Sequence, residues 1–121
     1  MDIAGQNKKM AEEWFRAFNK KDLEALLSLY HDKASHFSPK LRQRQPETKG
    51  LISGKPALRT WWQDAFERLP SLHYQVSHLT ADDTQVVMEY TRCVTGEDDM
   101  EVCEVLRIEQ GLIVFSKVYH G

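Results

Sequence analysis

The hydrophobic pattern of this chain changes its period once, at Pro70, and that change limits the folds the chain can adopt. Before Pro70, apolar residues recur at the spacing of one helix face. The segments with helical spacing are 10–18, 23–30 and 58–69. After Pro70, apolar and polar residues alternate as in half-buried strands, with turn residues between them. The alternating segments are 72–78, 84–95, 100–109 and 112–120. Helices followed by a four-strand meander predict an α+β domain with the helices on one face of an antiparallel sheet.

The stretch between the second and third helices has a pattern of its own. Residues 34–38 predict a short strand, which ends at Pro39 because proline cannot donate a sheet hydrogen bond. Residues 40–54 are polar and aperiodic, and they predict a long loop. The basic residues of this loop are Lys40, Arg42, Arg44 and Lys49. Such residues are usually solvated, and the functional alternative is a lid that attracts an anion to a pocket.

Length and charge exclude several classes of protein. The 121 residues predict a single domain over 1–121 that is large enough to bury its own core. A net charge of −2 gives no reason to expect a nucleic-acid or membrane partner. Because no apolar run reaches the length of a membrane span and no signal-peptide pattern stands at the start, we expect a cytoplasmic protein. The two cysteines are expected to be free, and no motif predicts a metal or a cofactor.

Two strands of the predicted meander each carry one charge on an otherwise apolar face. The first face is Val86, Met88, Tyr90, Arg92 and Val94, and the second is Met100, Val102, Glu104, Leu106 and Ile108. If Gly96 pairs with Met100 across the hairpin, Arg92 lies opposite Glu104. The two charges then form either a buried structural ion pair or part of the wall of a cavity. Burial raises the pKa of a carboxyl and a nearby arginine lowers it, so the protonation state of Glu104 stays open.

Four stretches carry a resemblance to a known family. They are residues 14–22, Ser38 with Pro39, residues 54–58 and residues 104–111. With the order of elements, they resemble the SnoaL-like branch of the nuclear-transport-factor-2-like superfamily, which also contains ketosteroid isomerases and polyketide cyclases. The resemblance covers nearly the whole chain. It implies a cone-shaped fold in which three N-terminal helices pack on a curved antiparallel sheet and enclose a pocket for a small, largely apolar molecule.

The resemblance carries over the ketosteroid isomerase site only in part. Trp14 stands where that family has an oxyanion-hole tyrosine, and Ser38 stands where it has the general-base aspartate. Glu104 retains the second oxyanion-hole acid, a carboxyl that the isomerases keep protonated. Val118 stands where epoxide-hydrolase-type relatives have their last aspartate. The resemblance therefore implies Glu104 as the central acid, without steroid isomerisation by the family's mechanism.

Two histidines complete the predicted site. His36 shares a strand face with Ser38, which the resemblance turns inward, and His120 falls on a pocket-lining position of the last strand. Each is either a general base near neutral pH or a hydrogen-bonded wall residue. The candidate catalytic residues are Glu104, His36 and His120. The candidate ligand-binding residues are Trp14, Phe18, Ser38, Trp62, Tyr90, Arg92, Leu106, Ser116 and Val118.

Three functional hypotheses share this fold. The leading one is a small-molecule pocket protein, with an enzyme of the isomerase, cyclase or hydrolase kind as its catalytic form. The second is a non-catalytic carrier or sensor of a small apolar or amphipathic ligand. The third is a dimeric interaction module whose pocket is filled by Trp14 and Trp62. In each case the outer sheet face, with apolar residues such as Cys103 and Tyr119, is expected to form a homodimer.

Overall fold

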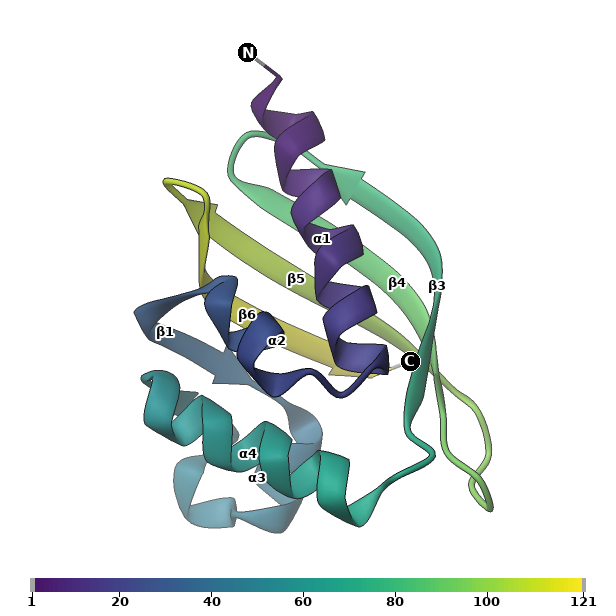
Figure 1. Ribbon diagram of the computed structural model, residues 1–121. Coiled ribbons are helices and arrows are strands. Elements are labelled where there is room, and N and C mark those ends of the chain that lie inside the picture. The colour runs from purple at the N-terminus through teal and green to yellow at the C-terminus, as the bar shows by residue number, and fades with distance from the viewer. Residues whose placement is uncertain (1, 121) are drawn as a thin grey trace.

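A six-stranded sheet lies at the centre of the computed structural model, which describes residues 2–120. The helices in this range are α1 (Ile3–Asn19), α2 (Leu23–Ser28), α3 (Pro39–Arg44) and α4 (Lys55–Arg68), with a 3-10 turn, η1 (Pro46–Thr48). The strands are β1 (Tyr30–Phe37), β2 (Leu51–Ser53), β3 (His73–Ala81), β4 (Gln85–Cys93), β5 (Met100–Glu109) and β6 (Leu112–His120). The strand order is β2-β1-β6-β5-β4-β3, and Figure 1 shows α1 lying across the sheet.

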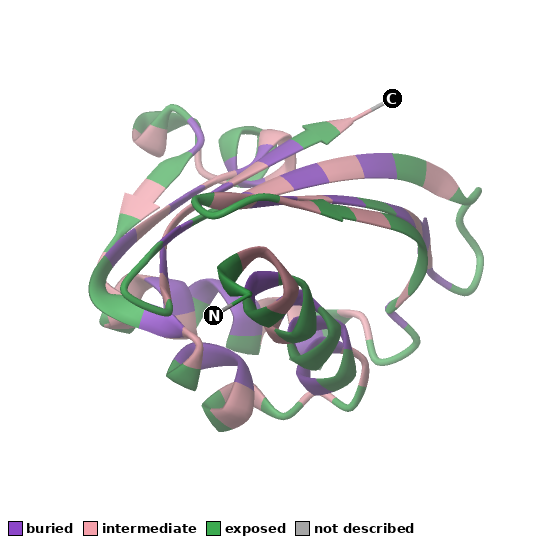
Figure 2. Cartoon of the chain, turned by 90° about the horizontal axis from the view of Figure 1, so that it is seen from above, coloured by how far each residue is buried: buried purple, intermediate pink, exposed green. Residues whose placement is uncertain are grey.

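The sheet curves around the helices instead of lying flat. Figure 2 shows it arching over α1, with the longer helices on its concave side. Register shifts between Val76 and His78 on β3 and between Arg107 and Ile108 on β5 add local twist. The predicted α+β fold, with helices packed on one face of a curved sheet, is confirmed, and so is the meander of β3, β4, β5 and β6.

The first two helices begin at side-chain caps. The carboxylate of Asp2 accepts the backbone N–H of Gly5 at 2.9 Å, and that of Asp22 accepts the N–H of Ala25 at 3.1 Å. The buried face of α1 carries Ala11, Trp14, Phe15 and Phe18, as its sequence spacing predicts. Helix α2 is shorter than predicted, because the chain turns at Leu29 and Tyr30 already belongs to β1.

Residues 40–54 are not the long loop that their polarity predicts. They form α3, η1 and β2. Helix α3 begins because Pro39 occupies its first turn and the Ser38 hydroxyl accepts the backbone N–H of Lys40 at 3.2 Å. Gly50, at φ 88°, then turns the chain into β2, where an added Cβ would lie 2.8 Å from the Phe37 ring. Elements this short have too few residues to show a period in the sequence.

The predicted register of the β4–β5 hairpin is wrong. Arg92 pairs with Met100, and Met88 is the residue opposite Glu104. The connection between the strands spans residues 94–99 and is longer than the short loop assumed from the sequence. Each residue keeps its predicted face because the register is displaced by an even number of residues. The sheet is also not fully antiparallel, since β1 pairs in parallel with β6.

The convex face of the sheet carries part of the predicted dimer surface. Tyr119 is 47% exposed, and Cys93 and Cys103 are half-buried free thiols. A homodimer through this face stays a prediction. Within residues 2–120, no helix is both long enough and apolar enough to cross a membrane.

Candidate functional site

A cavity of about 260 Å³ lies between the helices and the concave side of the sheet. Aromatic side chains form most of its inner wall: Trp14, Phe18, Trp61, Trp62, Tyr74 and Tyr90. Phe18 stacks on Tyr74 at 4.1 Å between ring centroids, and Tyr74 lies 4.3 Å from Tyr90. The volume is just below the range of about 300–1,000 Å³ typical of sites for drug-sized ligands, so the cavity suits a smaller molecule.

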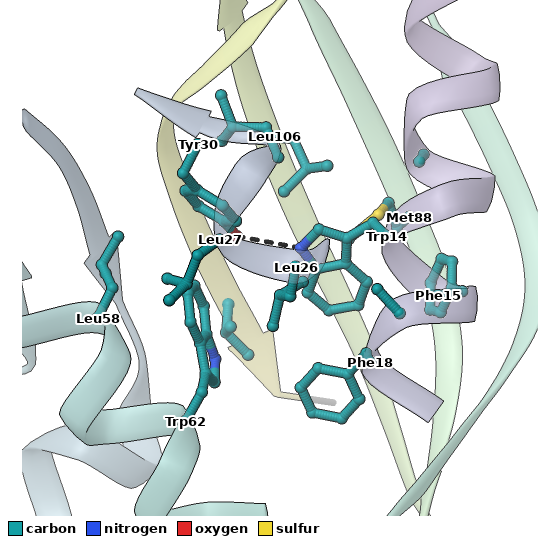
Figure 3. Close-up of a cluster of buried hydrophobic side chains, with 14 of the residues drawn as sticks. Trp14, Phe15, Phe18, Leu26, Leu27, Tyr30, Leu58, Trp62, Met88 and Leu106 are labelled. Atoms are coloured by element: carbon teal, nitrogen blue, oxygen red, sulfur yellow. Dashed lines mark hydrogen bonds between the residues drawn. The ribbon is translucent and has the colours of Figure 1, made fainter. Parts of the chain in front are cut away.

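Ten of the twelve predicted site residues line this cavity. They are Glu104, His36, His120, Trp14, Phe18, Ser38, Trp62, Tyr90, Arg92 and Val118. Leu106 does not line it, because it packs in the fully buried core opposite Val86. Ser116 is also fully buried and does not line it, although its hydroxyl hydrogen-bonds to the lining residue His36. Trp14 and Trp62, whose side chains Figure 3 shows in the buried cluster, form part of the wall of this cavity.

Several lining residues were missed by the sequence reasoning. They are Lys40, Gln43 and Arg44 from α3, Trp61, Ala65, Arg68 and Leu69 from α4 and the turn after it, and Leu72, Tyr74, Glu97 and Val102. For the residues from α3, the basic character of residues 40–49 was the one sequence feature that pointed to the cavity. The remaining residues are placed by the packing of α4 and by the hairpin register, which the sequence does not specify.

Glu104 is the most unusual group in the wall. Its side chain is only 2% exposed, and its Oε1 accepts a hydrogen bond from the Tyr90 hydroxyl at 2.7 Å. Within residues 2–120, Oε2 is buried and has no hydrogen-bond partner. Burial raises the pKa of Glu104 to about 7, against the smaller lowering effect of the Tyr90 hydrogen bond. Near neutral pH, Glu104 is therefore protonated in a large fraction of molecules.

The predicted ion pair between Arg92 and Glu104 does not form. Arg92 is also buried, at 8% exposure, but its Nη1 donates to Oε1 of Glu97 at 2.8 Å. The hairpin register explains why Arg92 pairs with Glu97, because it places Arg92 beside the β4–β5 connection that carries Glu97. Without a cation as a partner, Glu104 is subject mainly to burial, and burial favours its neutral form.

A chain of hydrogen bonds behind the wall orients His36. The indole Nε1 of Trp14 donates to the Tyr30 hydroxyl at 3.0 Å, the contact drawn in Figure 3. That hydroxyl donates to the Ser116 Oγ at 3.3 Å, and the Ser116 Oγ lies 2.6 Å from the Nδ1 of His36. Trp14, Tyr30 and Ser116 come from α1, β1 and β6, so the chain also ties three elements together.

The direction of this chain fixes which nitrogen of His36 carries the proton. An indole N–H can only donate, so Tyr30 accepts from Trp14 and uses its own hydrogen on Ser116. No other acceptor for the Ser116 hydroxyl is found among residues 2–120, so Ser116 donates to Nδ1 of His36. Burial lowers the pKa of His36 to about 4, which keeps the ring neutral at pH 7. A neutral imidazole that accepts at Nδ1 carries its hydrogen on Nε2. His36 is thus a hydrogen-bond donor at Nε2.

The Ser116 hydroxyl should matter for stability because it joins two buried polar groups. Replacing Ser116 with alanine leaves the Tyr30 hydroxyl without its acceptor and Nδ1 of His36 without its donor. We expect a loss of about 2 kcal/mol in the free energy of unfolding, measured by urea denaturation. Ser35→Ala is the matched control, since Ser35 bonds only Ser53 near the surface. Equal losses of unfolding free energy in the two variants would contradict this chain of hydrogen bonds.

Metal binding has no support among the described residues. Within residues 2–120, no three His, Cys, Asp or Glu side chains lie close enough to hold a metal ion. In particular, Glu104, His36 and His120 line one cavity without forming a ligand set.

The sequence of the chain matches the family model of the SnoaL-like domain over residues 11–116. The chain belongs to the SnoaL-like family. Among curated proteins, none matches this SnoaL-like chain. Solved structures with the same fold are numerous. One is a SnoaL-like protein of unknown function from Burkholderia thailandensis E264, with 25% identity, a TM-score of 0.87, and coverage of 97% of this chain and 95% of that one.

Two further structures represent the enzyme classes of the fold. A proposed ketosteroid isomerase from Kribbella flavida DSM 17836 has 17% identity and a TM-score of 0.82, covering 100% of this chain and 82% of that one. A proposed polyketide cyclase from Sinorhizobium meliloti has 15% identity and a TM-score of 0.77, covering 92% of this chain and 94% of that one. At these identities the likeness concerns the fold, and the function has to be argued from the site.

Proposed function

We propose that this SnoaL-like protein binds a small, largely apolar molecule in its cavity and holds an acceptor oxygen of that molecule, such as a ketone oxygen, at Glu104. The observation that carries the proposal is the buried, unpartnered Oε2 of Glu104, a residue that lines the cavity. A buried polar atom without a partner is costly, and a ligand that supplies one relieves the cost.

The protonated carboxyl is the form suited to this task. With its hydrogen on Oε2, Glu104 keeps Oε1 as the acceptor for Tyr90 and has Oε2 as a donor that no other described residue uses. His36 adds a second donor at Nε2 on the same wall. Hydrogen-bond donors aimed at one oxygen in a dry site stabilise negative charge as it develops there. The catalytic form of the proposal is therefore polarisation of a ketone for proton transfer at the neighbouring carbon, as isomerases and cyclases require.

The affinity of the cavity for ketones should depend on pH. It is measured with a panel of small aryl, terpenoid and steroid ketones, each compared with the hydrocarbon that lacks the oxygen. Affinity for the ketones should be about tenfold weaker at about pH 8.5 than at about pH 6, because the ionised carboxylate no longer donates. Glu104→Gln should show no such dependence, since its amide donates at both pH values. Affinity for ketones that stays constant with pH in the wild type would exclude a donating Glu104.

A carrier without catalysis is the second candidate, and a specific observation favours it. Turnover needs a base, but His36 presents a donor and the Ser38 hydroxyl caps α3 by accepting from Lys40. The two candidates separate in deuterated water. An enzyme exchanges hydrogen for deuterium beside the ketone carbon of a bound probe, and Glu104→Leu slows this exchange. A carrier binds the same probe, raises the melting temperature and leaves the probe unlabelled.

A further inference from the structure

The cavity has two chemically different ends. Buried aromatic side chains such as Trp14, Trp62 and Tyr90 form one part of its wall, whereas the lining residues with the most exposure, Gln43, Arg44, Arg68 and Glu97, are polar or charged and mark its mouth. Four cationic side chains are among the lining residues: Lys40, Arg44, Arg68 and Arg92. The whole chain carries a net charge of −2, so this gathering of positive charge is not a reflection of the composition.

Two of the four cations share one carboxylate as their partner. Arg68 Nε donates to Oδ2 of Asp64 at 2.7 Å, and Arg44 Nη2 lies 3.9 Å from the same oxygen. Asp64 itself does not line the cavity. The carboxylate is therefore shared on the outer side of the rim, where it holds both guanidinium groups and leaves an excess of one positive charge.

The other two cations are less completely paired. Arg92 gives one of its five N–H groups to Glu97 and is otherwise free to donate toward the cavity. Within residues 2–120, Lys40 makes no ion pair. Lys40 and Arg92 together exceed Glu97 by one positive charge. A single excess charge suits a monoanion.

His120 lies with these two cations at the mouth. Burial lowers the pKa of His120, and the charges of Lys40 and Arg92 lower it further. The three groups are therefore close enough to interact electrostatically, although they come from α3, β4 and the end of β6. Near neutral pH, His120 is uncharged and offers a hydrogen bond without adding a second positive charge.

We propose that the mouth of the cavity is a carboxylate subsite formed by Lys40, Arg92 and His120, and that the ligand is a small amphipathic acid with its acceptor oxygen at Glu104. This assignment rests on the proposed function for the inner end of the ligand. The carboxylate lies at the mouth, the apolar body lies along the aromatic wall, and the neutral oxygen lies innermost. The arrangement keeps the ionised group of the ligand away from the deep wall, where a charge would be desolvated.

Matched pairs of probes test the subsite. The probes are aryl ketones that carry a carboxylate at increasing distance from the ketone, such as 3-benzoylpropionate, each beside its methyl ester. The acid and the ester share the ketone and the apolar body, so their difference in affinity reports on the mouth alone. In at least one pair the acid should bind about tenfold more tightly than its ester to the wild type, measured by calorimetry at constant ionic strength.

Two variants test whether Lys40 causes the difference in affinity between acid and ester. Lys40→Gln should reduce the preference for the acid to about threefold or less and leave the affinity of the ester unchanged. Arg42→Gln is the control, because Arg42 is on the same helix but is exposed and does not line the cavity. It should retain the full preference.

Failure of the subsite can be told apart from failure of the proposed function. Esters that bind with the pH dependence expected of Glu104, without any preference for the acids, would overturn the carboxylate subsite and leave the proposed function standing. A preference for acids that Lys40→Gln and Arg42→Gln reduce equally would assign it to general charge attraction and overturn the subsite too. Failure of every acid and every ester to bind would overturn both.

Discussion

Replacing Glu104 with glutamine is expected to stabilise the protein by about 3 kcal/mol above about pH 8, and to change its stability little near pH 4. In the folded protein the pKa of Glu104 is about 7, compared with an ordinary value of 4.5. Between these two values the folded state keeps the proton and the unfolded state loses it. Stability from this group is therefore complete below about pH 4.5 and is lost as the pH rises through 7.

Glutamine removes the titration while keeping the shape. Its amide oxygen can accept from Tyr90 in place of Oε1, and no charge is buried at any pH. The free energy of unfolding is measured by urea denaturation of both proteins between about pH 4 and pH 9, and the difference is plotted against pH. Glu109→Gln, an exposed change on the same strand, is the control and should give a flat difference near zero. A flat difference for Glu104→Gln would contradict the raised pKa.

The sequence predicts the fold from its periodicity, and the face of each strand from its alternation. Glu104 was found in this way, because a single carboxyl interrupts an apolar row on β5. The ion-pair partner of Arg92 was not found. A strand places residues on a face without fixing their partners on the next strand, and the length of the 94–99 connection decides that Arg92 pairs with Glu97.

The orientation of His36 could not be predicted for a related reason. Its hydrogen-bond chain joins Trp14, Tyr30 and Ser116 from three elements. Two of those elements, β1 and β6, are paired in parallel although they lie at opposite ends of the chain. The sequence identified His36 and Ser116 as candidates by parity and resemblance, but only their contact shows that His36 donates from Nε2.

Glu104 and His36 oppose each other in their effect on stability. Burial raises the pKa of Glu104 and lowers that of His36, so in both residues the neutral form is favoured. Between about pH 4.5 and pH 6.5 both groups are mainly neutral in the folded protein, and the cavity presents two uncharged donors. Over this window the loss of stability from Glu104 with rising pH is offset by a gain from His36, so the two contribute little net slope in the wild type.

Replacing His36 with asparagine should reveal how much His36 contributes to the pH dependence of stability. The pKa of His36 is about 4 in the folded protein, compared with an ordinary value of 6.5. Between these values the unfolded state binds a proton that the folded state does not, so the contribution of His36 is complete above pH 6.5 and is lost as the pH falls through 4. The loss amounts to about 3 kcal/mol. As the pH falls from 7 to 4, the free energy of unfolding of His36→Asn should therefore rise by about that much relative to the wild type. A constant cost for the smaller side chain is added at every pH.

The two variants together make the test strict. Asparagine keeps an acceptor close to the position of Nδ1, so the Ser116 hydroxyl retains a partner and the constant cost stays small. His73→Asn, an exposed change at the start of β3, is the control for the loss of a histidine outside the cavity. In the window between pH 4.5 and 6.5, and relative to the wild type, stability should rise more steeply with pH in Glu104→Gln and less steeply in His36→Asn, and the two changes of slope should cancel in the double variant. Changes of slope of the same sign in the two single variants would mean that one of the two groups is charged in the folded protein, and the pocket could not then hold two neutral donors.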